Sequence, residues 1–293
     1  MSAFFSELGK RVAEKWLALA VLPGLLFLSA VITALSLGHT HALDLAMLTS
    51  RAKAFAVQFN GLGPTMAVLL VAGAMLAATA CGLAAQALAT LIQHSWFSTW
   101  TWFAPLGDRL LAKRRGRWND ITDAIDDAVR AGDPKDRYTA LAAARTRIAV
   151  SEPVLPSRIG DRLNAVDARV YAEYELDLVA AWPHLWLITP DTTRGELRTA
   201  AIRFSGTALQ MSWGVLYTVL GLVWWPALFA GAVTLLTTWH RARDSAETYA
   251  CLIEATVDLY GIELARSLGL AEEGGRFTAD HGKAITNLVR KGR

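Results

Sequence analysis

Cysteine and charge are both scarce over long parts of this sequence. The two cysteines, Cys81 and Cys251, lie too far apart to indicate a disulfide framework or a metal site with paired cysteine ligands. No Asp, Glu, Lys or Arg occurs from Ala54 to Gly107, from Trp16 to Leu37 or from Phe204 to Trp239. A soluble domain is about a quarter charged and would rarely leave such gaps. The absences predict a protein that crosses a membrane.

Motifs of known chemistry are absent as well. The sequence contains no Gly-x-Ser-x-Gly, Walker A, His-Glu-x-x-His or Cys-x-x-Cys pattern. No predicted span carries the charged residue expected of a proton or ion relay. We therefore expect neither an enzyme nor a coupled transporter, with no catalytic residue and no cofactor. The net charge of +3 is too small to indicate nucleic acid as a partner.

Apolar residues and tryptophan are abundant. Hydrophobic residues make up 53% of the chain, and its 11 tryptophans are typical of a protein with interfacial belts. A bilayer core of roughly 30 Å needs about 20 apolar residues. Trp16 to Leu37 is predicted to be a retained signal anchor after an amphipathic lead, Met1 to Lys15, and a second span runs from Leu62 to about His94. Phe204 to Trp239 can hold two short spans joined by a turn at Trp224-Trp225-Pro226.

Basic residues set the predicted orientation, because they mark the cytoplasmic ends of membrane spans. They occur at one end of each predicted span: Lys10, Arg11, Lys15, Arg109, Lys113, Arg114, Arg115, Arg117, Arg194, Arg198, Arg203, His240, Arg241 and Arg243. The sequence therefore predicts an all-α polytopic membrane protein with four transmembrane helices, a cytoplasmic helical domain and both termini cytoplasmic.

Four segments follow from these boundaries. Residues 1–107 form the amphipathic lead and the first transmembrane pair, and residues 108–203 form a cytoplasmic helical region. Residues 204–240 form the transmembrane hairpin, and residues 241–293 form a cytoplasmic helix with a basic tail.

The second predicted span has two distinct faces. Small residues at successive i+4 positions would let another helix approach closely: Gly73, Ala77, Cys81, Ala85 and Ala89. Polar side chains gather on another face: Thr65, Thr79, Gln86, Thr90 and Gln93. The small face predicts helix packing. The polar face predicts either hydrogen bonds within the helix bundle, which we favour, or the lining of a pore in an oligomer.

Aromatic and basic clusters follow that span. Four aromatic residues of a density typical of the lipid headgroup level come first: Trp96, Trp100, Trp102 and Phe103. Three arginines after them are candidates for anionic lipid headgroups, besides their topogenic role: Arg114, Arg115 and Arg117.

A metal site is not expected. His39, His41 and Asp44 have zinc-ligand chemistry. However, histidines at i and i+2 point apart on a helix, and no further ligand is nearby, so a solvated loop is the favoured interpretation.

Two predicted cytoplasmic helices carry opposite charge. A helix that begins after Ser157 carries three arginines on one face: Arg158, Arg162 and Arg169. A helix that continues to Ala271 carries an acidic stripe: Asp244, Glu247, Glu254 and Asp258. We expect the two to pair, within one chain or across a subunit boundary, with simple solvation as the alternative. Asp177, on the apolar face of the first helix, needs an Arg or a backbone donor because an unpaired buried charge is costly.

The stretch from Pro156 to Trp186 resembles a module of a known family. It opens with Pro-x-Arg-Ile-Gly (156–160), continues with Tyr-x-Leu-Asp (174–177) and ends with Trp-Pro-x-Leu-Trp (182–186). This pattern is similar to a little-characterised family of bacterial, mainly actinobacterial, multi-spanning membrane proteins, in which a hydrophobic hairpin and a cytoplasmic helix follow the module. Tyr249 and Asp258-Leu259 match that helix, while Asp161, Val166-Asp167 and His184 depart from the family pattern. The resemblance implies a bacterial inner (plasma) membrane and supports the topology, but implies no established activity.

Two functions fit these observations. The first, which we favour, is a non-enzymatic oligomeric scaffold or effector that presents the cytoplasmic helices to a protein partner. The second is a homo-oligomeric ion channel or pore, lined by the polar face of the second span and gated by the cytoplasmic helices. The expected partners are the bilayer with its anionic lipid, further copies of the chain, and a cytoplasmic protein.

Overall fold

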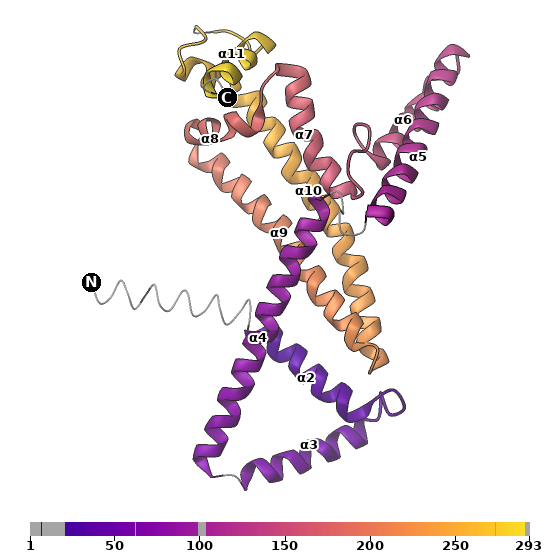
Figure 1. Ribbon diagram of the computed structural model, residues 1–293, viewed down its shortest axis with the longest axis vertical. Helices are drawn as coiled ribbons and strands as arrows, with labels where there is room; N and C mark the ends of the chain where they lie inside the picture. Colours follow the sequence, from indigo (N-terminus) through magenta and orange to yellow (C-terminus); the bar gives the residue numbers. More distant parts are fainter. Residues whose placement is uncertain (1–6, 8–20, 62, 99–103, 273, 291–293) are drawn as a thin grey trace. The chain divides into compact units, whose positions relative to one another are not determined.

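The chain folds into helices. The computed structural model describes residue 7 and residues 21–61, 63–98, 104–272 and 274–290, and this described part contains no β-strand. The all-α prediction is confirmed. The helices are, in chain order (Figure 1), α2 (Leu22–Leu37), α3 (Leu45–Asn60), α4 (Pro64–Phe97), α5 (Ala104–Arg130), α6 (Lys135–Ile148), α7 (Arg158–Tyr174), α8 (Leu178–Ile188), α9 (Asp191–Leu220), α10 (Trp225–Ser267) and α11 (Ala279–Val289).

One helix meets the requirements of a membrane span. Among the described residues, only α4 is long and apolar enough to cross a bilayer by length and composition. α2 and α8 are apolar but have fewer than 18 residues. The uncharged stretch from Phe204 to Trp239 divides between the end of α9 and the start of α10, each of which continues into charged sequence. Helix length and composition thus identify one candidate span.

The predicted helix after Ser157 is shorter than expected. α7 ends at Tyr174, because Glu175 adopts a left-handed conformation with φ of 51°. Asp177 is therefore not on the apolar face of α7. It caps the next helix, α8, by accepting a hydrogen bond from the backbone N–H of Ala180 at 3.1 Å. Leu176, between the two helices, is fully buried.

The other helix boundaries also differ in part from the prediction. α10 ends at Ser267 rather than Ala271, and its backbone is continuous from Trp225. Several predicted features lie outside the described residues: the amphipathic lead apart from Glu7, the start of the first span, Trp100, Trp102, Phe103, and the end of the basic tail.

The chain divides into two compact units, and the first comprises residues 1–92 and 207–239. Its helices approach closely through small residues: Gly24 of α2 faces the carbonyl oxygen of Ala78 on α4, where a Cβ on residue 24 would overlap it. Phe27 packs edge-on against Tyr217, with ring centroids 5.3 Å apart. The indole N–H of Trp224 donates to the carbonyl oxygen of Ala42 at 3.0 Å.

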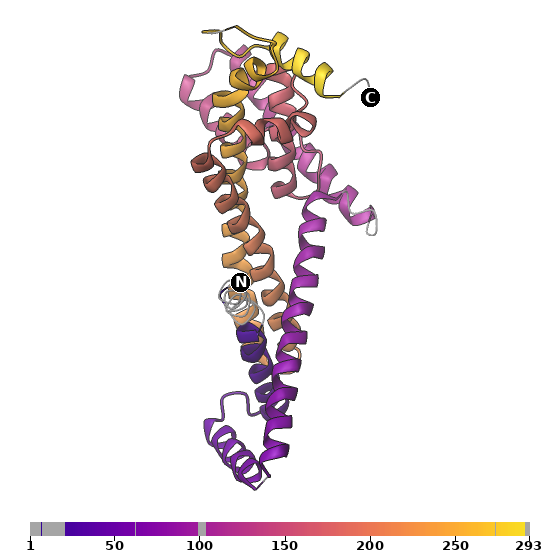
Figure 2. The ribbon, with the colours of Figure 1, turned by 90° about the vertical axis from the view of Figure 1, so that its left-hand side faces the viewer.

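The second unit comprises residues 93–206 and 240–293. Here α7, α8 and α11 gather around α10 (Figures 1 and 2). Their shared core is apolar, and its most deeply buried large side chains are Leu176, Leu185, Val257, Leu264 and Ile285. α5 and α6 pack against each other, and the guanidinium of Arg145 lies 5.3 Å from the ring centroid of Trp118.

Two helical glycines of this unit should respond to alanine in opposite directions. Gly282 of α11 lies against the carbonyl oxygen of Tyr174, where a Cβ would overlap it, whereas a Cβ on Gly116 of α5 meets nothing. Alanine favours a helix by about 1 kcal/mol over glycine, but overpacking costs about 1–3 kcal/mol. We expect Gly282→Ala to lower the thermal unfolding midpoint, followed by circular dichroism, and Gly116→Ala to leave it unchanged or raise it. Equal stability of the two variants would contradict the close approach.

Candidate functional site

The start of α7 is fixed by contacts to the end of α4. Ser157 caps α7 by accepting from the N–H of Gly160 at 2.9 Å, and its hydroxyl donates to the carbonyl oxygen of Trp96 at 2.6 Å. A Cβ on Gly160 would overlap that same carbonyl. The Pro-x-Arg-Ile-Gly motif therefore sets the position of α7. Only glycine fits at the last position of the motif, residue 160.

Asp161 and Arg114 hold the segment that precedes α7. One oxygen of Asp161 accepts from the N–H groups of Val154 at 2.9 Å and Leu155 at 2.6 Å. The other oxygen pairs with the guanidinium of Arg114 at 2.6 Å. Arg114 also donates to the carbonyl oxygen of Leu155. This segment is thus built by charge-assisted hydrogen bonds, which are stronger than neutral ones.

These contacts bear on the arginines predicted to meet lipid headgroups. Arg114 is engaged as described, and Arg115 donates to the carbonyl oxygen of Pro153 at 2.7 Å. Arg117 is exposed on α5. Two of the three candidates therefore already serve the fold of the chain itself.

Arg162 joins α7 to α10. Its side chain is 7% exposed and donates through Nε to Glu247 and through Nη1 to Glu254, both at 2.8 Å. Burial disfavours the charged form of Arg162, but the two carboxylates outweigh it and raise its pKa. Burial likewise acts against the charge of Glu247, yet hydrogen bonding to Arg162 holds the pKa of that carboxyl below its usual range. These pairings lie within one chain.

The other charged residues predicted to pair between α7 and α10 differ in how many partners they have. Arg169 makes a second contact to Glu254 at 3.2 Å, with 53% of its side chain exposed. Asp258 accepts from the hydroxyl of Tyr174 at 3.0 Å. Burial, reinforced by Asp258, raises the pKa of Tyr174. The side chain of Arg158 forms no hydrogen bond or ion pair with any other residue that the structure describes.

Asp177 has both kinds of partner expected for it. Besides capping α8, its carboxylate pairs with Arg290 at 2.6 Å. Hydrogen bonding to the N–H of Ala180 is the main reason that the pKa of Asp177 is lowered; burial opposes it and Arg290 adds to it. The N–H of Asp177 donates to Thr286 Oγ1 at 3.0 Å, so α11 holds the turn between α7 and α8 from outside.

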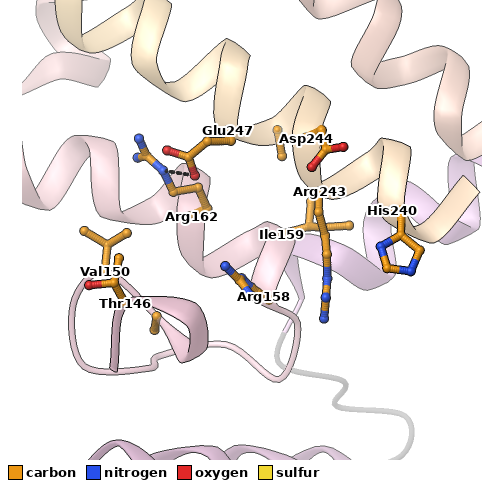
Figure 3. A pocket seen from close by; sticks show the side chains of 11 residues that line it. Thr146, Val150, Arg158, Ile159, Arg162, His240, Arg243, Asp244 and Glu247 are labelled. Carbon is orange, nitrogen blue, oxygen red and sulfur yellow. Dashed lines mark hydrogen bonds and ion pairs between the residues drawn. The ribbon is translucent and has the colours of Figure 1, made fainter. Parts of the chain in front are cut away.

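A pocket of about 420 Å³ lies beside Arg162. Its lining comes from the end of α6 and the two residues after it, from the start of α7 and from the part of α10 that begins at His240. Figure 3 shows the side chains of Arg158, Arg243 and His240, which line this pocket together with the Arg162–Glu247 pair. The pocket therefore collects three guanidinium groups and an imidazole.

The polar face of α4 is largely satisfied by its own backbone. The hydroxyls of Thr79 and Thr90 donate to the carbonyl oxygens four residues earlier, at 2.8 and 3.1 Å. Gln93 donates to the carbonyl oxygen of Ser205 at 3.4 Å. The side-chain amide of Gln86 is exposed and makes no hydrogen bond to another described residue. Thr65 is exposed as well.

The buried face of α4 follows a different register from the predicted small stripe. Ala78, Gly82, Ala85 and Ala89 are buried. Ala85 and Ala89 belong to the prediction, whereas Gly73 and Ala77 are exposed and Cys81 is half-buried. An i+4 series slowly rotates around a helix of 3.6 residues per turn. The N-terminal part of the predicted stripe therefore lies on a face of α4 that the rest of the described chain does not cover.

Two further predicted clusters have local structural roles. Asp44 caps α3 by accepting from the N–H of Met47 at 2.8 Å, and His39 Nε2 lies 2.7 Å from the carbonyl oxygen of Leu222. His41 Nδ1 lies 3.0 Å from Thr40 Oγ1. Trp96 is 3% exposed and packs on Phe204, with centroids 5.4 Å apart, so it contributes to packing rather than to an exposed aromatic belt.

Sequence reasoning missed several of the residues that build this region. Arg290 and Thr286 lie in the part that the sequence predicts to be a basic tail. No local pattern indicates that these two residues contact Asp177. His240 and Arg243 were interpreted only as topogenic charges. The available signal for a shared site was that both residues lie at the start of the charged part of α10. This signal becomes useful only once the packing of α7, which places Arg158 opposite them, is known.

Comparison with protein-family models, curated proteins and solved structures finds no match to the chain.

Removing the guanidinium of Arg162 should destabilise this unit more than removing that of Arg169. Arg162→Met leaves the carboxylate of Glu254, 19% exposed, without its closest partner. Breaking a charged hydrogen bond costs about 1–3 kcal/mol. Arg169→Met is the matched control, since it touches the same carboxylate from an exposed position worth at most about 1 kcal/mol. Chemical unfolding would measure both, and equal losses would contradict the central role of Arg162.

The Asp177 carboxylate should stabilise the fold in a pH-dependent way. Because its pKa is lowered on folding, its contribution is present above the ordinary Asp pKa of about 3.9 and is lost as the pH falls through the lower folded value. Asp177→Asn keeps a capping oxygen but removes the charge. We expect the stability difference from the wild type to be largest near neutral pH and to shrink in acid. Asp123→Asn, which changes an exposed carboxylate on α5, should show no such trend.

Proposed function

We propose that this protein is a non-enzymatic, four-span protein of the bacterial inner membrane, with both termini in the cytoplasm. In this proposal it acts as an oligomeric scaffold or effector that presents its second unit to a cytoplasmic protein. The observation that carries the proposal is α4, a 34-residue helix without Asp, Glu, Lys or Arg up to its end at Phe97.

The exposure of α4 supports a lipid environment. Its large apolar side chains face outward, among them Val68 at 67%, Leu69 at 60% and Leu76 at 72% exposure. The most apolar window of the helix is only 11% buried. Exposing apolar surface to water costs about 25 cal/mol per Å² relative to burying it. Lipid chains or further copies of the chain would cover it.

The hairpin formed by α9 and α10 supports the second transmembrane pair. The two helices approach closely where Gly231 faces Thr218 and the carbonyl oxygen of Gly214, and small residues at such crossings are typical of helix pairs in lipid. The uncharged arms on either side of residues 221–224 are short for a bilayer of roughly 30 Å. Local thinning of the bilayer and flanking Arg and Trp side chains can accommodate such a mismatch.

The second unit supports the scaffold. It has a continuous apolar core and an internal ion-pair network, as a folded interaction module requires. It also keeps large apolar side chains on its surface, with Val179 and Leu187 both 76% exposed and Ile202 70% exposed. Exposed apolar patches on folded modules are typical of interaction surfaces.

A homo-oligomeric channel is the alternative function, and Gln86 is the observation that favours it. Gln86 is an exposed amide in the middle of the apolar α4, and a pore lining can consist of such uncharged polar groups. The hydroxyls of Thr79 and Thr90 have backbone acceptors, which removes the need for water beside them.

Conductance and mass together separate the two functions. For a scaffold we expect the purified protein to form an oligomer of defined mass in detergent and to give no conductance in planar bilayers. A pore would conduct, with a conductance changed by Gln86→Leu and not by the control Gln58→Leu, which alters an exposed amide on α3. Conductance with that dependence would overturn the scaffold proposal.

The topology can be tested by labelling with a membrane-impermeant maleimide. In a background with Cys81→Ala and Cys251→Ser, we expect Thr40→Cys to react from outside intact spheroplasts. Asn287→Cys, an exposed position on α11, should react only after the membrane is opened. Reaction of both positions from the same side would contradict the four-span topology.

A further inference from the structure

The charges in the pocket beside Arg162 do not cancel. Arg162 and Glu247 are occupied with each other at 2.8 Å. The lining also contains Arg158 and Arg243, with Asp244 as its other acidic residue, and the imidazole of His240. The lining therefore has three arginines against two carboxylates.

Arg158 bears that surplus most directly. Burial, together with repulsion from Arg243 and Arg114, lowers its pKa, although Glu247 attracts it. A guanidinium stays protonated in proteins. Arg158 is therefore a charged group held partly out of water, with no hydrogen bond or ion pair to the rest of the described chain. An anion in the pocket would supply the missing partner.

The lining of the pocket indicates which anion fits. Guanidinium groups bind phosphate through paired, parallel hydrogen bonds, and two of them beside an imidazole form a suitable set of donors. The pocket lining contains no Phe, Tyr or Trp among the described residues, so it offers no ring of these residues against which a nucleotide base could stack. Apart from these donors and the carboxylates of Asp244 and Glu247, the lining is small or aliphatic, with Ala149, Val150 and Ile159 among its residues.

We propose that this pocket binds a phosphate group through Arg158, Arg243 and His240, and that the phosphate is the headgroup of an anionic phospholipid. His240 directly follows Trp239, the last residue of the uncharged stretch, on the unbroken helix α10. In the proposed topology this is the cytoplasmic headgroup level, where anionic lipid and tryptophan gather. The choice of a lipid rests on the proposed function; the phosphate chemistry rests on the pocket alone.

Lipid titration of the full-length protein in a neutral detergent tests the proposal. We would add phosphatidylglycerol, phosphatidylcholine or inorganic phosphate at constant ionic strength and follow the thermal unfolding midpoint. We expect saturable stabilisation by phosphatidylglycerol and little by phosphatidylcholine. Arg158→Gln should weaken the apparent affinity for phosphatidylglycerol by about 10-fold or more, as expected for the loss of a charged hydrogen-bonding partner.

Arg241→Gln is the matched control. Arg241 is exposed on the same turn of α10 and does not line the pocket. We expect it to change the affinity less than about twofold, because screened surface charges contribute little. Equal losses of affinity in Arg158→Gln and Arg241→Gln would mean that the lipid is attracted by the surface charge in general. This result would overturn the proposal that the pocket is the binding site. If Arg158→Gln does not fold, Arg158→Lys replaces it, since lysine keeps the charge but loses the paired geometry.

The arms of the experiment also separate the two sources of phosphate. Stabilisation by inorganic phosphate equal to that by phosphatidylglycerol, with the same dependence on Arg158, would support the site and overturn the lipid as its ligand. Native mass spectrometry should show retained phosphatidylglycerol in the wild type and its loss in Arg158→Gln. None of these measurements depends on conductance or on the labelling pattern, so failure of the proposed function would be recognised separately.

Discussion

The second unit depends on one guanidinium group placed between two helices. Arg162 of α7 reaches Glu247 and Glu254, which lie two turns apart on α10, and so fixes both the distance and the register of the helices. The apolar core contributes most of the burial, but apolar contacts are not directional. A charged fork with two acceptors is directional. With this register set, Val166 and Val170 face Val257 and its neighbours, and the core closes.

The same arrangement leaves Arg158 without a carboxylate. Arg158 precedes Arg162 by about one helical turn, and Glu247, the carboxylate of α10 that attracts Arg158, is already bonded to Arg162. Asp161, between them in sequence, faces the other way and holds Arg114 and the backbone of residues 154–155. The surplus positive charge therefore arises from how the acidic groups are allocated, and not from an excess of arginine in the sequence.

Much of this could be predicted from the sequence. The helical periodicity, the uncharged stretches and the matched charges of Arg162, Arg169, Glu247 and Glu254 are all local patterns. The end of α7 could not be predicted, because Glu175 takes a left-handed conformation that sequence favours only for Gly or Asn. The partner of Asp177 could not be predicted either, since Arg290, which directly follows α11, lies more than a hundred residues further along the chain. The predicted small-residue face of α4 coincides only in part with the face that is buried within the chain, because a regular i+4 series rotates around the helix.

The contact between α11 and the turn at residues 175–177 has a consequence for synthesis of the chain. Thr286 and Arg290 reach a segment made before α8, α9 and α10, so this contact closes a loop that contains the whole uncharged hairpin. It cannot form while those helices are still being translated. Until then Leu176 and Leu178 lack part of their cover, and Asp177 lacks its arginine. The core of the second unit is therefore completed only after the hairpin has left the ribosome, which makes its completion a late, long-range step of folding.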